Sequence, residues 1–451
     1  MRKFFAFEGT IGRLPYALSS LAIVALPYAA VRLVFAALHQ PWAATWRSST
    51  VPLFALGELE HLPLFTLPLA FLALLVVYWA LAALAFRRAA DAAADGWIAA
   101  LVVAPGFQIP AILYLSFLPR RPQPAPTADA IPDGRMEWRS AAQGVLTGMA
   151  LTLFGVAAGA LVFGSYGFGI FVLTPFVIGV ATAFLANRVR DIGWRQTHHL
   201  TALALTLGGT ALVLVALEGL VCIVLAAPLA YGTALVGALL GRAAAQRPGR
   251  RGRSTLTAFA ILPAMFASEQ AFPATTTFAT DESIDIAAPP DAVWRALIRM
   301  DRIDGPPSLP FRLGVAYPLR GEIAGSGVGA IRTGVFSTGI ALERVTEWQA
   351  DRVLGFVVLS DPPAMHEMSP YAHVNAPHVQ GYFRTVSTRF EIVGLAGGRS
   401  RLSEHTVHAL RLDPILYWLP LARWIIHQNN ARVLASVRAH AEHRAMARQT
   451  L

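Results

Sequence analysis

The sequence is poor in charged residues, lysine and cysteine. Only 14% of its 451 residues are charged, whereas soluble domains contain about 25%. Lys3 is the only lysine. Cys222 is the only cysteine, which excludes an intrachain disulfide and a zinc site built from several cysteines. No cleavable signal peptide is evident, because no convincing A-x-A site follows the first apolar run. This composition is typical of a membrane protein.

The basic surplus lies in the N-terminal part of the chain. Residues 1–280 contain 19 Lys/Arg and 11 Asp/Glu, whereas residues 281–451 contain 18 and 16. A basic surplus between apolar runs sets membrane topology. We therefore expect a bilayer partner and no nucleic acid.

Long apolar runs occupy most of residues 1–280. A helix needs about 20 apolar residues to cross the hydrocarbon core of a bilayer. Six stretches meet this requirement, namely 17–38, 63–86, 141–163, 168–187, 199–217 and 219–241. The last two are interrupted only near Glu218-Gly219, which predicts a tight helical hairpin with Glu218 at its tip.

Two further apolar stretches, 97–118 and 255–272, are ambiguous. Arginine-rich loops flank 97–118 on both sides, and such loops lie in the cytoplasm. We therefore expect a re-entrant hairpin bent at Pro105-Gly106, with a single span as the alternative. Five arginines in 242–254 favour a crossing by 255–272, which would place the following residues outside. If 255–272 only lies in the interface, those residues are cytoplasmic.

A short motif occurs twice. "RRAAD" (87–91) and "NRVRD" (187–191) each end an apolar run and precede a Gly-Trp pair. Either the membrane part is a parallel repeat, which would suit a transporter, or the similarity is chance. We expect Asp91 and Asp191 to cap a helix or to pair with the arginine one turn earlier.

The first of these motifs belongs to a longer pattern, "FEGTIGRLPYAL", then "RRAADAAADGW", then "PGFQIPAILYLSFLP". This pattern resembles a family of small bacterial inner-membrane proteins of unknown function. The matching residues are Gly12, Arg13, Tyr16, Arg87, Arg88 and Asp91. The family's second Arg, the Trp after the Tyr and the His of its second motif are missing. The resemblance implies an architecture and no chemistry.

The composition becomes ordinary from Asp281 onward. In "ESIDIAA", Ile284 and Ile286 alternate with polar residues, which predicts a half-buried strand. Pro289-Pro290 end that strand, and "PDAVWRALIRM" predicts a helix. Further strands are predicted at 327–336, 340–349, 352–360, 379–393 and 399–410. A long helix is predicted at 414–447, with Ile426, Val433, Val437 and Ala441 on one apolar face.

This order of elements, together with "IDIAAPPDAVWRAL", "EHTVHALRLDP" and "HQNNARVLASVRAHAE", resembles the SRPBCC superfamily, also called START-like or polyketide-cyclase-like. Further stretches, among them "SPY" (369–371) and "PHVQGYF" (377–383), resemble a poorly characterised bacterial branch. The resemblance implies a helix-grip fold with an apolar cavity between a curved antiparallel sheet and the C-terminal helix. Many members bind a lipid or another hydrophobic molecule, and some are enzymes.

Polar residues gather in the long connection 362–384. Such connections are often functional. Three hypotheses compete, and the third is favoured: a metal site, for which the histidine spacing is irregular; an acid–base pair such as Glu367 with His378; and a cavity lid that orients a ligand. The candidate catalytic residues are Glu367 and His378. The candidate ligand-binding residues are Tyr371, His378, Tyr382, Arg384 and His427. His366 and His373 lie in the same connection.

Other charged residues are secondary candidates. His427 either faces the cavity, because its neighbour Ile426 lies on the apolar stripe, or is a satisfied, partly buried histidine, which is the more frequent outcome. Arg332 and Arg384 either bind an anionic headgroup or, as we favour, pair across the sheet with Glu343 or Glu347. Arg32, Glu218 and Glu269 lie at or near membrane depth, where ionisable residues are often functional.

The sequence therefore predicts a polytopic α-helical membrane domain followed by an α+β helix-grip domain. The expected segments are 1–118 (first membrane unit), 119–140 (cytoplasmic linker), 141–272 (second membrane unit and last span) and 280–451 (cavity domain). We expect a multi-pass protein of a bacterial inner membrane, with the cavity domain outside, that binds a lipid or another hydrophobic small molecule. A cyclase or dehydratase and a transporter are the alternatives. No cofactor or metal is expected.

Overall fold

The computed structural model describes residues 9–42, 48–49, 52–59, 62–63, 65–94, 96–102, 108–121, 138–246, 254–271, 273, 275–369, 371 and 376–449. The chain divides into two compact units. The membrane unit comprises Met1–Glu218, Cys222–Ala274 and Asp413–Tyr417, and the helix-grip unit comprises Gly219–Val221, Thr275–Leu412 and Trp418–Leu451.

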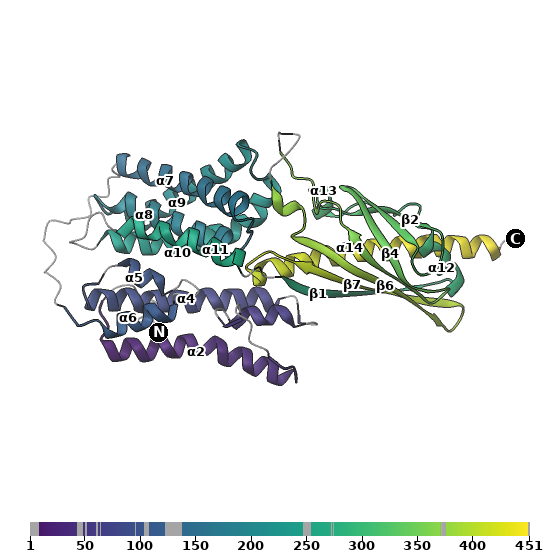
Figure 1. Cartoon of the computed structure of the whole chain (residues 1–451), viewed down its shortest axis with the longest axis horizontal. Coiled ribbons are helices and arrows are strands. Elements are labelled where there is room, and N and C mark those ends of the chain that lie inside the picture. Colours follow the sequence, from purple (N-terminus) through teal and green to yellow (C-terminus); the bar gives the residue numbers. More distant parts are fainter. Residues whose placement is uncertain are drawn as a thin grey trace. The chain divides into compact units, whose positions relative to one another are not determined.

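Apolar helices build the membrane unit (Figure 1). Within the described residues, six stretches are long and apolar enough to cross a bilayer. They are α2 (Arg13–Ala37), α4 (Thr66–Asp91), α7 continued by η2 (Trp138–Val162), η3 continued by α8 (Gly169–Asn187), α9 (Gly193–Leu214) and α10 (Leu220–Ala245). These helices confirm the six predicted spans. The short 3-10 helix η1 (Pro52–Glu58) lies between α2 and α4.

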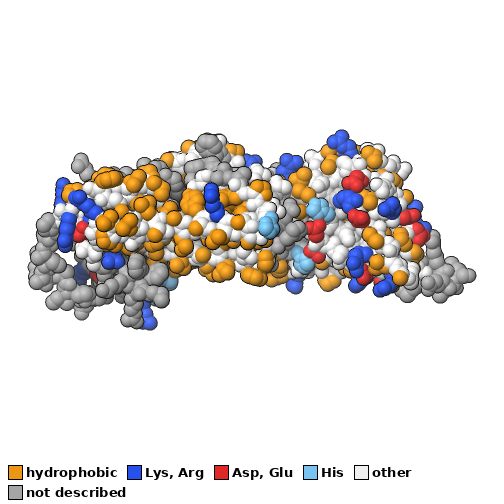
Figure 2. Space-filling view, turned by 90° about the horizontal axis from the view of Figure 1, so that it is seen from below, with side chains coloured by type: hydrophobic (Ala, Val, Ile, Leu, Met, Phe, Trp, Pro, Cys, Tyr) orange, Lys and Arg blue, Asp and Glu red, His pale blue; other side chains and the backbone are white. Residues whose placement is uncertain are grey.

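The outer surface of the membrane unit is apolar. Leu14, Leu18 and Leu33 of α2 are 60–71% exposed. Figure 2 shows hydrophobic side chains over most of the membrane-unit surface in view. Exposed leucines at this density suit a hydrocarbon environment, because apolar patches of this extent are rare on soluble monomers.

The ambiguous stretch 97–118 is not one helix. It contains α5 (Gly96–Leu101) and α6 (Gln108–Phe117), and the bend expected at Pro105-Gly106 lies outside the described residues. Beyond α6, the Arg121 amide donates a hydrogen bond to the carbonyl of Asp91, at the end of α4, over 3.0 Å. The chain after α6 therefore lies beside the end of α4, close to where the stretch 97–118 begins. A re-entrant hairpin requires this arrangement. Most of the expected linker 119–140 lies outside the described residues.

Helix α11 (Ser254–Ala271) is not among the six long apolar helices. Its 18 residues span about 27 Å. It packs against α5 and also against η3. Near its C-terminal end, Glu269 accepts hydrogen bonds from the Ser165 hydroxyl and the Gly169 amide, at 2.5 and 2.8 Å. Its C-terminal end therefore lies beside the turn between α7 and α8.

The helix-grip unit contains one curled antiparallel sheet of seven strands in the order β1-β7-β6-β5-β4-β3-β2. The strands are β1 (Thr276–Ile286), β2 (Pro318–Ala324), β3 (Ile331–Phe336), β4 (Gly339–Gln349), β5 (Val353–Ser360), β6 (Phe383–Leu395) and β7 (Arg399–Leu410). The helices are α12 (Pro290–Ile298), α13 (Leu309–Arg312), η4 (Pro377–Val379) and α14 (Ile415–Gln449). This arrangement confirms the predicted helix-grip fold. Strand β2 and helix α13 are additions to the predicted elements, and β1 begins at Thr276, ahead of the stretch 282–288 in which the strand was predicted.

The core of this unit lies between the sheet and the helices α12 and α14. Ile286 is fully buried and Ile284 packs against the same core, as the alternation in β1 predicts. Val433, Val437 and Ala441 of α14 are buried there too, and Trp294 of α12 meets Trp348 of β4 edge to face at 5.2 Å. The concave face of the sheet therefore faces α14.

Candidate functional site in the helix-grip unit

One face of β7 carries the polar residues that lie inside the unit. Strand β7 is buried at every second position, namely Ser400, Leu402, Glu404, Thr406, His408 and Leu410. Its neighbour β1 places Glu282, Thr280 and Phe278 opposite Glu404, Thr406 and His408. Successive side chains of a strand point to opposite faces, so these residues share the inner face of the sheet.

Four of the inner polar residues bond to one another. The Thr406 hydroxyl lies 2.6 Å from that of Thr280 and 3.1 Å from Nε2 of His408. The side-chain amide of Asn430, on α14, donates to the Thr406 hydroxyl over 3.0 Å. The other ring nitrogen of His408 lies 3.4 Å from the Thr385 hydroxyl. This chain of bonds connects α14 to the sheet and satisfies the buried polar atoms.

His408 lies between two aromatic rings. The rings of Phe278 and Phe383 each have their centroids 5.3 Å from that of His408. Burial, with a smaller contribution from the charge of His405, lowers the pKa of His408 from 6.5 to about 3. The imidazole is therefore neutral near pH 7 and serves as a hydrogen-bonding group.

A buried ion pair lies farther across the sheet. Arg332 of β3 pairs with Glu343 of β4, which lies directly opposite it. The Arg332 guanidinium also lies 4.5 Å from the centroid of the Phe356 ring. Pairing with Glu343 confirms the expectation for Arg332. A buried pair of this kind adds little net stability, because desolvation opposes the attraction.

Glu404 lies on the same inner face and is 5% exposed. Among the described residues, its Oε2 atom has no hydrogen-bond partner. Burial raises the pKa of Glu404 from 4.5 to about 8; Arg332 lowers that pKa and Glu282 raises it, both by smaller amounts. Glu282 pairs with His427 of α14. Near pH 7, Glu404 is therefore mainly a neutral carboxylic acid.

The predicted acid–base pair lies on the connection between β5 and β6. His378 lies in η4, and its Nε2 atom is 3.6 Å from Oε1 of Glu367. The structure thus brings these two residues together. Tyr371 is 45% exposed. His373 lies outside the described residues.

Two of the other predicted ligand-binding residues, Arg384 and His427, have exposed side chains. Arg384 pairs with Asp361 at 3.6 Å, so the expected pairing with Glu343 or Glu347 is wrong. The Tyr382 ring lies 5.5 Å from the guanidinium of Arg411. The His427 side chain is 54% exposed, which contradicts the expectation that it faces the interior. Its position on α14 directs it toward Glu282 at the edge strand β1.

The inner polar residues were missed, although the sequence carries a signal for them. In "RSRLSEHTVHAL" (399–410), Glu404, Thr406 and His408 lie at every second position, in step with Leu402 and Leu410. In a strand with one buried face, residues two apart lie on the same side, so these polar residues share the side of the two leucines. The long connection 362–384 attracted attention because it holds more polar residues.

In the membrane unit, the motif residues form a second cluster. Arg88 is fully buried and pairs with Asp91 at 2.5 Å. Its guanidinium also donates to the carbonyls of Leu115, over 3.0 Å, and Leu118. Arg13 donates to the Leu118 carbonyl over 2.9 Å. Because the last carbonyls of a helix lack partners within it, the two arginines cap the C-terminal end of α6.

The second copy of the motif is held differently. Asp191 accepts a hydrogen bond from the Gly193 amide over 3.0 Å, which caps α9. Its charged partner is Arg242 of α10 at 2.8 Å. Arg188, one turn earlier, bonds to Gln143 instead, so the expected arginine partner is correct for Asp91 and wrong for Asp191. The relation between the two copies stays a prediction.

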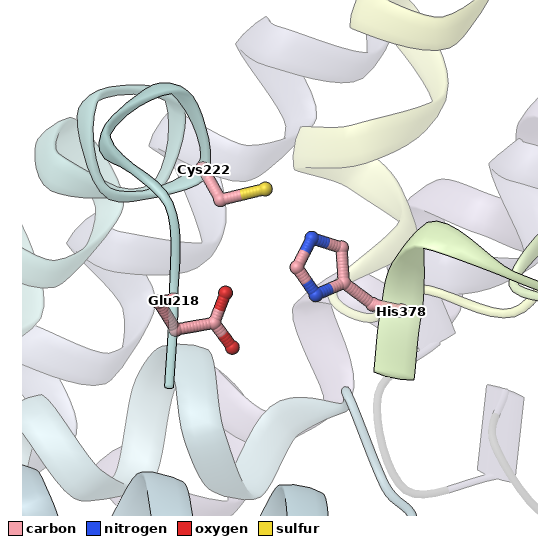
Figure 3. A group of neighbouring side chains, drawn as sticks. All are labelled: Glu218, Cys222 and His378. Carbon is pink, nitrogen blue, oxygen red and sulfur yellow. The ribbon is translucent and has the colours of Figure 1, made fainter. Parts of the chain in front are cut away.

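Other ionisable residues of the membrane unit occupy helix ends. Glu218 lies in the turn between α9 and α10, as predicted, and accepts a hydrogen bond from the Tyr166 hydroxyl over 2.7 Å. Figure 3 shows the side chains of Glu218 and Cys222, which follows in the first turn of α10, pointing in the same direction. The third residue drawn there, His378, belongs to the helix-grip unit. The Arg32 guanidinium lies 5.8 Å from the Trp42 ring.

The comparison with protein families bears on the Arg88 cluster. Residues 4–126 match the DUF805 family, described as a protein of unknown function. This range contains Arg13, Arg88 and Asp91, and the match confirms the resemblance predicted from them. In the DUF805 segment, the motif residues join the C-terminal end of α6 to the end of α4. None of the curated proteins compared with the chain matches it.

Solved structures resemble the helix-grip unit. The Zhui aromatase/cyclase from Streptomyces sp. R1128 has 16% sequence identity and a TM-score of 0.24, over 37% of this chain and 95% of that chain. Truncated norcoclaurine synthase from Thalictrum flavum has 15% identity and a TM-score of 0.24, over 38% and 94%. Ara h 8.0201 has 14% identity and a TM-score of 0.24, over 37% and 97%.

Proposed function

We propose that this multi-pass membrane protein binds a lipid or another hydrophobic small molecule between the curled sheet and α14. The observation that carries the proposal is the inner face of the sheet, where Arg332, Glu343 and Glu404 are buried beside the rings of Phe356 and Phe390. Small-molecule sites are mostly apolar and contain a few placed polar groups. A core built for stability alone would avoid such groups, because their desolvation is unfavourable.

We further propose that the membrane is the inner membrane of a bacterium and that the helix-grip unit lies outside it. The arginine-rich ends of α4 and α10 define the cytoplasmic end. Glu269 binds Ser165 and Gly169, in the turn that joins the other ends of α7 and α8. Helix α11 ends beside that turn just before β1, which supports a position of the helix-grip unit outside the membrane.

The experiment compares bound lipid in two variants of the full-length protein. Thr388→Trp introduces a large side chain on the inner face, where Thr388 is 7% exposed. Val393→Trp introduces the same side chain on the outer face of the same strand, where Val393 is 48% exposed. Each protein is purified in detergent, and its extracted lipid is measured by mass spectrometry. Transfer of NBD-labelled phospholipid from donor vesicles is measured in parallel.

We expect Thr388→Trp to lose both copurified lipid and uptake, and Val393→Trp to retain them. Circular dichroism checks that both variants remain folded. Equal lipid content and equal uptake in wild type and the two variants would contradict the proposal, because blocking the inner face would then have no effect.

The contact between His378 and Glu367 supports a second candidate, an enzyme of the cyclase or dehydratase kind. A histidine beside a carboxylate can transfer protons to and from a carbonyl substrate. In this case His378→Ala or Glu367→Gln abolishes turnover of a hydrophobic carbonyl compound without changing the fold. Unchanged turnover in both variants removes the pair from any mechanism.

A further inference from the structure

We propose that the bound molecule carries an uncharged oxygen group, a hydroxyl or a carbonyl, and that the side chain of Glu404 hydrogen-bonds this group inside the helix-grip unit. This inference rests on the proposed function and names the chemistry of its ligand. It concerns an apolar molecule with one polar head, such as a long-chain alcohol, ester or ketone.

Glu404 is buried and has an oxygen atom that no described residue pairs with. Its side chain is buried on the inner face, opposite Glu282 on one neighbouring strand and Phe390 on the other. Among the described residues, Oε2 of Glu404 has no hydrogen-bond partner. Leaving a buried polar atom unpaired is unfavourable, so a ligand group that pairs with Glu404 would be recognised selectively.

The polar groups around Glu404 are already paired. Thr280, Thr406, His408 and Asn430 bond to one another. Arg332 is neutralised by Glu343, and Glu282 pairs with His427. Of the polar groups named on the inner face, Glu404 is the one that offers an unpaired atom.

The charges around Glu404 select among classes of ligand. The charged groups that act on Glu404 are Arg332 on β3 and Glu282 on β1, and these pair with Glu343 and His427 in turn. Arg332, the cation that acts on Glu404, is balanced by Glu343, so a ligand carboxylate or phosphate beside Glu404 would meet a neutralised arginine and two nearby acids. An ionised Glu404 would attract an amine, but its burial favours the neutral acid. A carboxylic acid has one O–H donor and one carbonyl acceptor. The O–H can donate to a ligand carbonyl or hydroxyl, and the carbonyl oxygen can accept from a ligand hydroxyl.

The experiment uses photoreactive probes on the full-length protein in nanodiscs at pH 7. Three 16-carbon probes carry the same mid-chain diazirine and end in a hydroxyl, an ammonium or a plain methyl group. Crosslinks to peptides of β7 and α14 are quantified by mass spectrometry. The variants are Glu404→Leu, which removes the polar group, and Glu404→Gln, which stays neutral and keeps a donor and an acceptor. Glu391→Leu, at a 48% exposed side chain of β6, is the matched control.

We expect the hydroxyl probe to label the interior about threefold to tenfold more than the methyl probe, as one hydrogen bond implies. Glu404→Leu should abolish this preference and retain labelling by the methyl probe. Glu404→Gln and Glu391→Leu should retain the preference.

The other outcomes separate the two proposals. If the wild type shows no preference, or if Glu404→Leu leaves the preference unchanged, the role of Glu404 is overturned while the binding function stands. A preference for the ammonium probe that Glu404→Gln abolishes would show an ionised Glu404 and overturn the inference. If no probe labels the interior, the proposed function itself fails.

Discussion

At the residue scale, Glu404 and His408 should make the stability of the helix-grip unit depend on pH in opposite directions. The pKa of Glu404 is raised from 4.5 to about 8. Between these values the folded state holds a proton that the unfolded state has lost, so stability falls as pH rises. The pKa of His408 is lowered from 6.5 to about 3. Between those values the unfolded state holds the extra proton, so stability rises with pH.

The two effects overlap between pH 4.5 and 6.5, and only Glu404 acts between pH 6.5 and 8. We therefore expect the free energy of unfolding to fall from pH 6.5 to pH 8 in the wild type and to stay flat in Glu404→Gln. Urea unfolding of the full-length protein in detergent, followed by hydrogen exchange of β7 peptides, measures this difference. A wild-type curve that is flat or rises in this interval would show that Glu404 is ionised in the folded state.

The ion pair between Arg332 and Glu343 gives a second residue-scale prediction. Removing one partner leaves an uncompensated buried charge, so Glu343→Gln should lower the stability of the unit by about 3–5 kcal/mol. Replacing both, as Arg332→Met with Glu343→Leu, should recover most of this loss. The control is Glu347→Gln, whose partner Arg389 lies at a half-exposed position. Denaturant titration measures all three, and a double variant no better than the single one would contradict the prediction.

At the element scale, helices α8 and α10 are in contact through glycines. A Cβ atom added at Gly237 would collide with the carbonyl oxygen of Phe176, and one added at Gly241 with that of Val180. Small residues four apart allow membrane helices to approach this closely. Gly237→Ala should therefore separate the helices and destabilise the membrane unit by roughly 1–3 kcal/mol.

Gly232, in the same helix, supplies the matched control. An added Cβ there meets nothing within 4 Å, so Gly232→Ala should leave the stability unchanged or slightly raised. Thermal unfolding in detergent compares the two variants. If both variants lose the same stability, the loss comes from replacing a glycine in α10 and not from the contact between α8 and α10.

The cap on α6 leads to a further element-scale prediction. Lysine in place of Arg88 could keep the charge near Asp91 but cannot reach two carbonyls with one planar group. Arg88→Lys should therefore raise hydrogen exchange in residues 108–117. Arg120→Lys should not, because Arg120 is 80% exposed although it lies 3.1 Å from Asp91. If hydrogen exchange in residues 108–117 is the same in both variants, Arg88 does not contribute to the cap, and Arg13 alone caps α6.

Elements were predictable where one local signal governs them. The six spans follow from apolar length, and β7 and α14 follow from their periodicity. Strand β2 was missed because "PLRGEIA" has few β-branched residues and is placed by pairing with β3. The partner of Asp191 was missed for the same reason, since Arg242 lies 51 residues away in sequence. Contacts that depend on tertiary packing leave no local pattern.

At the scale of the whole molecule, the proposed position of the helix-grip unit outside the membrane depends on whether α11 crosses the bilayer. Helix α11 is less apolar than the six spans, yet its end bonds to the turn between α7 and α8 through Glu269. The five arginines of 242–254 precede it. We therefore expect residues after Ala271 to be accessible from outside the cell membrane and Arg190 to be accessible from the cytoplasm.

Single-cysteine labelling of the full-length chain tests this expectation. Cys222→Ser removes the only native thiol. Val328→Cys then places a thiol at a 69% exposed position of the helix-grip unit, and Arg190→Cys places one in the loop between α8 and α9. A membrane-impermeant maleimide applied to spheroplasts should label Val328→Cys at once and Arg190→Cys only after permeabilisation. The reverse pattern would place the helix-grip unit in the cytoplasm, and its ligand would then come from the cytoplasmic leaflet or the cytosol, because α11 would lie along the interface instead of crossing.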